Sequence, residues 1–293
     1  MYKELTLYEI GKEHLLKKSR SNIIKDEIIS ISINGDRILV LTRRSSIYIL
    51  KYNEFSALFY TLIADDFYTR YIHKVRFLDY DTIVGSDKFE NFFIYRIPKD
   101  QYNNFETGRH AIKDSMTGFM TNSNDSFLHA ANLKLVLMNE IHLGEIITEF
   151  QIIKIKEDFE NNNEEENENS ENSGNSKMNN SDDEMDENKI KAILYGTLAG
   201  GIGMFIQFNK KEDGLFFAQM ELLLREYIDE PTGRNILMAK SQYVPVKNII
   251  DFNLIYEFFN IEPSLQKKIA EELGDKPVNE IKNKISEIRN LFQ

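Results

Sequence analysis

Short apolar runs separated by polar turns fill the first two hundred residues. Each run is rich in Ile, Val, Leu, Phe and Tyr, which predicts β-strands, and two runs around one polar turn predict a hairpin. We expect hairpin turns at Gly11–Lys12, near Arg44, near Phe89 and at Gly200–Gly201. The second and third turns lie about 45 residues apart, which is the spacing of four-stranded propeller blades.

After Lys210 the apolar positions recur at helical spacing. Residues 213–228 are expected to form a helix, with one apolar stripe made of Leu215, Phe216, Met220, Leu223, Leu224 and Tyr227. Three more helices are expected, with start or stop signals at Asp251, Pro263, Gly274 and Pro277. We expect the stripes to face a helical core, and a groove for a partner is the alternative. The fold class is therefore mainly β over residues 1–210, followed by α over 211–293.

A glycine-rich stretch, "AILYGTLAGGIGMFIQF", raises the alternative of a nucleotide-binding enzyme that uses the Gly196–Gly203 loop. A P-loop needs Lys and then Ser or Thr directly after its second glycine, and this chain has Ile202 and Gly203 there. The dinucleotide pattern also fails, because Ile206 stands where the third glycine is required. The stretch therefore lacks the residues that phosphate binding needs.

A hairpin accounts better for the same glycines. Gly200–Gly201 is a two-residue turn that accepts positive φ, and it would place Gly196 opposite Phe205 and Leu198 opposite Gly203. Each glycine would then face a large apolar residue across the ladder, a complement of sizes that fills space. We interpret the stretch as structural.

The acidity of the chain is concentrated in one insert. The net charge is −11, and residues 157–188 hold thirteen acidic residues and one lysine, so the rest of the chain carries +1. The insert is rich in Asn and poor in apolar residues, which predicts disorder. An acidic docking segment for a basic partner is the alternative. A nearly neutral body gives no basic surplus for nucleic acid, so we expect RNA contact to be indirect or weak.

Candidate chemistry is sparse. The chain has no cysteine, and its five histidines, His14, His73, His110, His129 and His142, show no metal-binding spacing. The densest acidic set outside the insert is Asp65, Asp66, Asp79, Asp81 and Asp87. A pair of these could serve glycoside hydrolysis, but Asp beside strands more often caps turns. We expect no catalytic, cofactor-binding or metal-binding residues, no cofactor, no small-molecule substrate and no membrane segment.

Three segments carry a resemblance to a known family. They are "ADDFYTRYIHKVRFLDYDTIVGSDKFENFFIYRIP", "LYGTLAGGIGMFIQF" and "YVPVKNIIDFNLIYEFF". Together they resemble the closing part of the large propeller subunits of splicing factor 3b, the cleavage and polyadenylation specificity factor and the damaged-DNA-binding complex. The first segment looks closest to the splicing member, with Ser86 and Glu90 as departures. Glu90 replaces a turn glycine and would strain a turn that needs positive φ.

The resemblance implies a non-enzymatic scaffold. It assigns 1–210 to the last blades of the third WD40-like β-propeller and 211–293 to a helical C-terminal domain. The implied partners are the HEAT-repeat subunit and the small subunit of splicing factor 3b, in branch-site recognition in the nucleus. Partner-binding residues are unknown. The chain would be a fragment, or missing strands would come from another chain. Leu5, Leu7 and Ile10 would then lie on an uncovered apolar face.

Overall fold

A computed structural model describes most of the chain. The described residues are 4–21, 24, 26–44, 46–53, 60–66, 68–98, 131, 133–156, 189–228, 240 and 246–290. The acidic insert at 157–188 lies outside them, so its expected disorder stays a prediction. Within the described residues, no helix is long and apolar enough to cross a membrane.

The first two sheets are built from strands that follow one another in the sequence, except for β10, which comes later in the chain. A hairpin of β1 (Leu5–Ile10) and β2 (Leu15–Ser21) stands first. A five-stranded sheet follows in the order β10-β6-β5-β4-β3, made of β3 (Ile28–Asn34), β4 (Arg37–Thr42), β5 (Ile47–Tyr52), β6 (Tyr60–Asp65) and β10 (Leu133–Lys134). Strands β3 to β6 run antiparallel to their neighbours, and β10 pairs parallel to β6.

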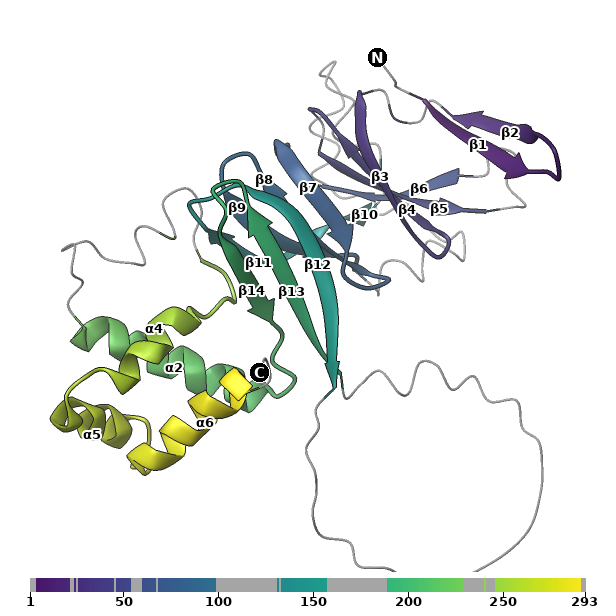
Figure 1. Cartoon of the computed structure of the whole chain (residues 1–293). Coiled ribbons are helices and arrows are strands. Elements are labelled where there is room, and N and C mark those ends of the chain that lie inside the picture. The colour runs from purple at the N-terminus through teal and green to yellow at the C-terminus, as the bar shows by residue number, and fades with distance from the viewer. Residues whose placement is uncertain are drawn as a thin grey trace, which may run out of the picture. The chain divides into compact units, whose positions relative to one another are not determined.

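Two more sheets repeat this pattern. A four-stranded antiparallel sheet has the order β11-β9-β8-β7, made of β7 (Ile72–Phe77), β8 (Thr82–Asp87), β9 (Asn91–Arg96) and β11 (Val136–His142). A three-stranded sheet follows in the order β12-β13-β14, made of β12 (Ile147–Lys156), β13 (Lys189–Thr197) and β14 (Ile202–Ile206) (Figure 1). Successive up-and-down sheets of about four strands are typical of propeller blades. The mainly β fold class is confirmed.

Equivalent turns in the first two large sheets each end in a residue with positive φ. Ser46 immediately precedes β5 with φ 88°, and Glu90 immediately precedes β9 with φ 69°. Each turn joins the second and third strands of its sheet. The turns predicted near Arg44 and Phe89 are therefore confirmed, and so is the repeat that relates them. The first turn is confirmed as well, because the Gly11 N–H donates to the His14 carbonyl across it, at 3.0 Å.

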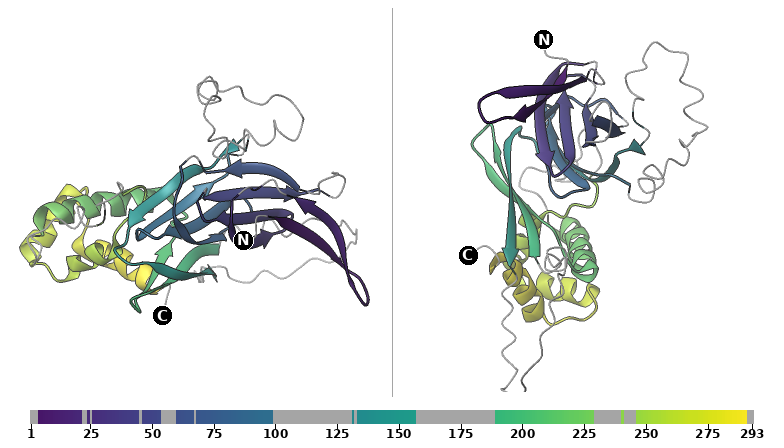
Figure 2. Two further views of the ribbon diagram at one scale, coloured as in Figure 1. Left: turned by 90° about the horizontal axis from the view of Figure 1, so that it is seen from above. Right: turned by 90° about the vertical axis from the view of Figure 1, so that its right-hand side faces the viewer.

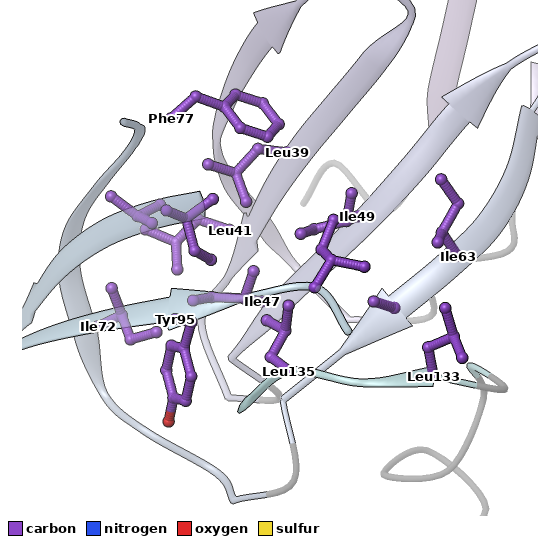
Figure 3. Close-up of a cluster of buried hydrophobic side chains, with 14 of the residues drawn as sticks. Leu39, Leu41, Ile47, Ile49, Ile63, Ile72, Phe77, Tyr95, Leu133 and Leu135 are labelled. Atoms are coloured by element: carbon purple, nitrogen blue, oxygen red, sulfur yellow. The ribbon is translucent and has the colours of Figure 1, made fainter. Parts of the chain in front are cut away.

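The main core lies between the five-stranded and four-stranded sheets. Side chains from both sheets form one buried cluster, of which Figure 3 labels Leu39, Leu41, Ile47, Ile49, Ile72, Phe77 and Tyr95. The cluster also includes Ile83 and Phe93. The rings of Phe93 and Tyr95 lie 5.1 Å apart between their centroids. Strand β8 is buried along its whole length, as a central strand of a packed sheet should be.

The other face of the five-stranded sheet is only partly covered. Leu5 is buried with Val40 and Leu50, and Leu7 packs against the same cluster. The expectation that Leu5 and Leu7 are uncovered was wrong, because the β1–β2 hairpin folds onto this sheet of its own chain. Ile10 is 85% exposed, as expected.

The hairpin around Gly200 has a different register from the predicted one. The Thr197 N–H donates to the Gly201 carbonyl at 2.8 Å, and the Gln207 N–H donates to the Lys191 carbonyl at 3.1 Å. Residue 197 therefore faces 201, and Gly196 faces Ile202 rather than Phe205. The loop has three residues and ends in Gly200 at φ 90°, a common hairpin geometry. The Thr197 hydroxyl also accepts from the Gly201 N–H at 2.8 Å, which favours this closure.

The helices begin and end at the predicted signals. They are α2 (Lys211–Tyr227), α4 (Phe252–Tyr256), the 3₁₀ helix η3 (Glu257–Phe259), α5 (Pro263–Glu272) and α6 (Val278–Asn290) (Figure 2). The Asp251 carboxylate caps α4 by accepting from the Asn253 N–H at 3.1 Å. Gly274, at φ 98°, follows α5.

The buried face of α2 differs slightly from the predicted stripe. Phe216, Met220 and Leu224 are buried as expected, and Phe217 joins them. Leu215 was expected in the stripe but is 55% exposed. The run of adjacent apolar residues fits two overlapping helical faces, and packing of Phe217 against the rings of Phe208 and Phe252 selects one of them.

The contacts divide the chain into two compact units. The two sheets packed face to face belong to one unit and the helices to the other, and the strands of the third sheet are divided between them. The first helix begins at Lys211. The domain boundary expected after residue 210 stays a prediction.

Candidate functional site

The segment from Leu78 to Ile97 belongs to the first of the three segments that carry the family resemblance, and it contains three of the five candidate aspartates. It forms the β7–β8 turn, all of β8, the β8–β9 turn and all of β9. Asp79 and Asp81 lie at one end of β8, and Asp87 lies at the other. The length of β8 separates Asp87 from Asp79 and Asp81, so the structure does not bring Asp87 together with either of them as a catalytic pair.

Asp81 joins the two large sheets. Its carboxylate accepts from the Arg37 guanidinium of β4 at 2.5 Å, and Arg37 also donates to the Tyr80 carbonyl at 2.7 Å. The guanidinium lies 3.7 Å from the centroid of the Tyr80 ring. Arg37 is 1% exposed, so the carboxylate and the ring provide charge and stacking partners for a buried cation.

Asp79 and Asp87 cap turns, which confirms the structural interpretation of these residues. The Asp79 carboxylate accepts from the Asp81 N–H at 2.9 Å. The Asp87 carboxylate accepts from the N–H groups of Phe89 and Asn91, at 2.9 and 3.0 Å. Such side-chain acceptors hold a tight turn in place of backbone partners.

The two departures from the family pattern lie in or beside the β8–β9 turn. Glu90 adopts φ 69°, so this turn does need the positive φ that a glycine would supply without strain. The Glu90 carbonyl accepts from the Leu143 N–H at 2.9 Å. Ser86 is buried and donates to the Ile147 carbonyl at 3.4 Å, so a small polar residue is accommodated there.

Asp65 and Asp66 belong to a buried polar network between the sheets. Asp65 pairs with Lys134 and accepts from the Ala131 N–H at 3.3 Å. Burial raises the pKa of Asp65 to about 6, and the ion pair with Lys134 offsets only part of that rise. Asp66 accepts from the hydroxyls of Ser46 and Tyr95, at 2.9 and 3.2 Å.

The same network includes the side chain of Arg70. The Arg70 guanidinium donates to the Glu140 carboxylate at 2.5 Å and lies 3.9 Å from Asp66. Burial also raises the pKa of Asp66 and that of the Tyr95 hydroxyl. Each carboxylate is engaged by donors within the core, an arrangement that stabilises packing between sheets.

The histidines and the carboxylates form no cluster that could hold a metal ion within the described parts of the chain. His142 is buried, and its Nδ1 lies 3.1 Å from the Asn91 side-chain oxygen. His73 is exposed on β7, and His14 lies in the first hairpin loop. His110 and His129 lie outside the described residues.

The Gly196–Gly203 loop forms the hairpin described above. A side-chain carbon added at Gly201 would lie 2.9 Å from the Glu145 carboxylate and 2.9 Å from the Thr197 hydroxyl. A carboxylate beside the loop repels phosphate, which is the reverse of what a nucleotide site requires.

Sequence reasoning missed a set of exposed apolar side chains at these turns. Tyr71 is 51% exposed, Phe89 54% and Leu198 71%. The rings of Tyr71 and Phe89 meet edge to face at 5.9 Å between centroids. An aromatic residue at the tip of a hairpin, where polar residues are usual, was the available signal in the sequence.

The family comparison places the chain in one class of protein. Residues 1–260 match the family described as the CPSF A subunit region. The chain belongs to this family.

The curated relatives give a more particular similarity. The chain is 29% identical over 295 residues to "Splicing factor 3B subunit 3" of Danio rerio, covering 99% of this chain and 21% of the relative. It is 30% identical to "Spliceosome-associated protein 130 A" of Arabidopsis thaliana and to "Probable splicing factor 3B subunit 3" of Dictyostelium discoideum, covering 98% of this chain and 20% of each relative. The chain spans about a fifth of the length of these relatives.

Proposed function

We propose that this chain is part of a non-catalytic scaffold subunit of the splicing factor 3b complex in the U2 small nuclear ribonucleoprotein. It acts in pre-mRNA splicing and branch-site recognition through protein–protein contacts in the nucleus. The observation that carries this proposal is the similarity along nearly the whole chain to relatives named as splicing factor 3B subunit 3 and spliceosome-associated protein 130.

The chemistry of the described residues supports a scaffold. All five candidate aspartates have structural partners. Asp81 forms an ion pair, Asp79 and Asp87 cap turns, and Asp65 and Asp66 belong to a buried network. In this proposal, residues 1–210 supply the last blades of a third propeller and residues 211–293 a helical C-terminal domain. The proposed partners are the HEAT-repeat subunit and the small subunit of splicing factor 3b, with RNA contact indirect or weak.

Purification of the tagged chain from nuclear extract tests the assignment. Quantitative mass spectrometry should recover the HEAT-repeat subunit and the small subunit in stoichiometric amounts. Gly85→Val is a suitable control, because a side-chain carbon there would lie 2.6 Å from the Phe93 ring and disrupt the fold. The control should lose both subunits.

The family description favours a second candidate, a scaffold of cleavage and polyadenylation. Recovery of polyadenylation factors in place of splicing factors would assign the chain to that complex. Recovery of ubiquitin-ligase subunits would assign it to the damaged-DNA-binding type.

A nucleotide-binding enzyme that uses the Gly196–Gly203 loop is a third alternative, disfavoured by Glu145. Calorimetry with ATP, GTP and NAD at millimolar concentration tests it. Binding that is lost in Gly200→Val would overturn the scaffold proposal.

A further inference from the structure

Three neighbouring turns form a continuous rim on the sheet unit. They are residues 88–90 between β8 and β9, residues 143–146 between β11 and β12, and residues 198–201 between β13 and β14. The Leu143 N–H donates to the Glu90 carbonyl at 2.9 Å, and the Leu198 N–H donates to the Ile146 carbonyl at 2.8 Å. These two bonds hold the three turns side by side, and we call them the turn rim.

Large apolar side chains stand out from both ends of the turn rim. Tyr71 and Phe89 form an exposed aromatic pair at one end, next to the Lys88 N–H, which donates to the Tyr71 carbonyl at 2.9 Å. At the other end, Leu198 is 71% exposed and Ile202 is 80% exposed. The equivalent turn of the five-stranded sheet carries two arginines, at 43 and 44, so the turn geometry does not itself require an apolar tip.

The backbone beneath these side chains is already ordered. Asp87 caps the first turn, and the Thr197 hydroxyl closes the third. Because the turns are fixed before any partner arrives, binding would order few additional groups. Exposed aromatic and apolar anchors on a preorganised backbone are typical of interface hot spots.

The charges on the turn rim indicate what kind of molecule binds. Lys88 and Glu145 are both exposed, and neither forms an ion pair within the described residues. A polyanion such as RNA would be attracted by Lys88 but repelled by Glu145 and by Glu90. A protein segment can present a carboxylate to Lys88 and a cation to Glu145 at once.

We propose that the turn rim docks a partner protein through a segment with large apolar side chains, one carboxylate facing Lys88 and one basic residue facing Glu145. This interaction surface does not depend on which complex contains the chain. The apolar anchors supply the affinity, and the two opposite charges fix the direction in which the segment lies.

The first experiment uses the tagged full chain in its native assembly. Zero-length carbodiimide crosslinking joins a lysine amine to a carboxylate that it contacts. We expect crosslinks from Lys88 to an Asp or Glu, and from Glu145 to a Lys, of one and the same partner protein. Lys88→Arg keeps the charge, so it should remove the first crosslink and leave the amount of partner recovered unchanged. Crosslinks from these residues to two unrelated proteins, or to none, would overturn the proposal.

The second experiment measures the contribution of the apolar anchors. Phe89→Ser combined with Leu198→Ser should lower recovery of that partner at least tenfold, while the circular dichroism spectrum and Tm stay unchanged. The matched control is Ile10→Ser combined with Leu16→Ser, which are comparably exposed on the β1–β2 hairpin and should leave recovery unchanged.

Binding of a fluorescent single-stranded RNA oligonucleotide tests the alternative that RNA, and not a protein segment, occupies the turn rim. If the RNA binds the full chain and Phe89→Ser abolishes that binding, the turn rim is an RNA surface and the proposal is wrong. Equal recovery of the partner by the anchor variant and the wild type would also overturn it.

Discussion

The guanidinium of Arg37 lies 3.7 Å from the centre of the Tyr80 ring and donates to the Asp81 carboxylate at 2.5 Å. This relationship ties β4 of one sheet to the β7–β8 turn of the other. The cation is almost fully buried, so its energy depends on the partners that replace water. The stretch "LDYDT", which is part of the family resemblance, thus connects two sheets.

Removing the carboxylate should be costly because it leaves the Arg37 charge buried. We expect Asp81→Ala to lower the free energy of unfolding by about 3 kcal/mol. Arg37→Met combined with Asp81→Ala should cost less than the sum of the two single changes. Urea denaturation of the dilute chain, followed by circular dichroism, measures both. The control Glu4→Ala breaks the exposed pair with Arg20 and should cost less than about 1 kcal/mol. An equal loss for Asp81→Ala and Glu4→Ala would contradict this account.

Glu90 should be a site where a single substitution stabilises the protein. Its φ of 69° is strained for a residue with a side chain and not for glycine. We expect Glu90→Gly to raise the free energy of unfolding by about 1 kcal/mol. Glu90→Ala keeps the strain and should change it little, so the pair of variants separates backbone strain from loss of the side chain. A lower Tm for Glu90→Gly than for Glu90→Ala would show that the turn is not strained.

Local patterns in the sequence predicted the strands and helices well. The features that they did not predict depend on contacts between residues that the patterns do not relate. The alternation of apolar residues, the N-cap Asp251 and the stop at Gly274 were sufficient to place strands and helices. The predicted register around Gly200 was wrong, because the observed register is set by a three-residue loop and by the hydrogen bond to the Thr197 hydroxyl. The positions of the glycines in the sequence specify neither the loop length nor this hydrogen bond.

The candidate site was harder to predict than the fold, because most of its contacts join residues that are far apart in the sequence. The turn interpretation of Asp79 and Asp87 was confirmed, because its partners lie within four residues. The network of Asp66 with Ser46 and Tyr95 joins positions 20 and 29 residues away. The turn rim brings Phe89 and Leu198 onto one surface only through the pairing of whole sheets, which composition and spacing do not specify.

Stability should decrease as pH rises through the range in which Asp65 titrates. Its pKa is about 6 in the folded protein, against 3.8 for an ordinary Asp, because burial disfavours the charged form. Below pH 3.8 both states hold the proton, and between these values the folded state holds more protons than the unfolded state. The ionised Asp65 therefore lowers the free energy of unfolding by about 3 kcal/mol above about pH 6, and acidification removes this loss.

Asp65→Asn removes this titration, so the variant should gain stability relative to wild type by about 3 kcal/mol between about pH 4 and about pH 7. Urea denaturation at each pH measures the difference. Glu149→Gln is a control for which we expect a change in stability of the opposite sign. Burial raises the pKa of Glu149, but the hydrogen bond from Lys74 and the charge of Arg76 hold this pKa below its usual value. A pH-independent difference for Asp65→Asn would mean that Lys134 keeps Asp65 ionised throughout.

The acidic insert should be dispensable for folding. It connects β12 to β13, which are neighbours in one sheet, and the Thr148 hydroxyl donates to the Gly196 carbonyl at 3.1 Å near the far end of that pair. Shortening a long loop changes its closure entropy by only about 0.6 kcal/mol per halving of length. Because the shorter loop also favours the folded state, deletion of residues 158–187 should not lower Tm by more than about 5 °C. A larger fall would mean that the insert packs against the folded chain.

The isolated chain should self-associate through the outer strand of its five-stranded sheet. β3 ends the sheet order, and its sequence, "IISISIN", contains none of the charged or proline residues that protect an edge. Ile31 and Ile33 are 49% and 67% exposed, opposite Val40 and Ile38 on the partly covered face. Analytical ultracentrifugation should show association that increases with concentration. Ile31→Lys combined with Ile33→Lys should suppress it, because charges on an edge strand oppose pairing with another edge. Leu215→Lys, at a comparably exposed position on α2, is the control and should leave association unchanged. A monodisperse wild-type monomer at all concentrations would show that this face needs no further cover.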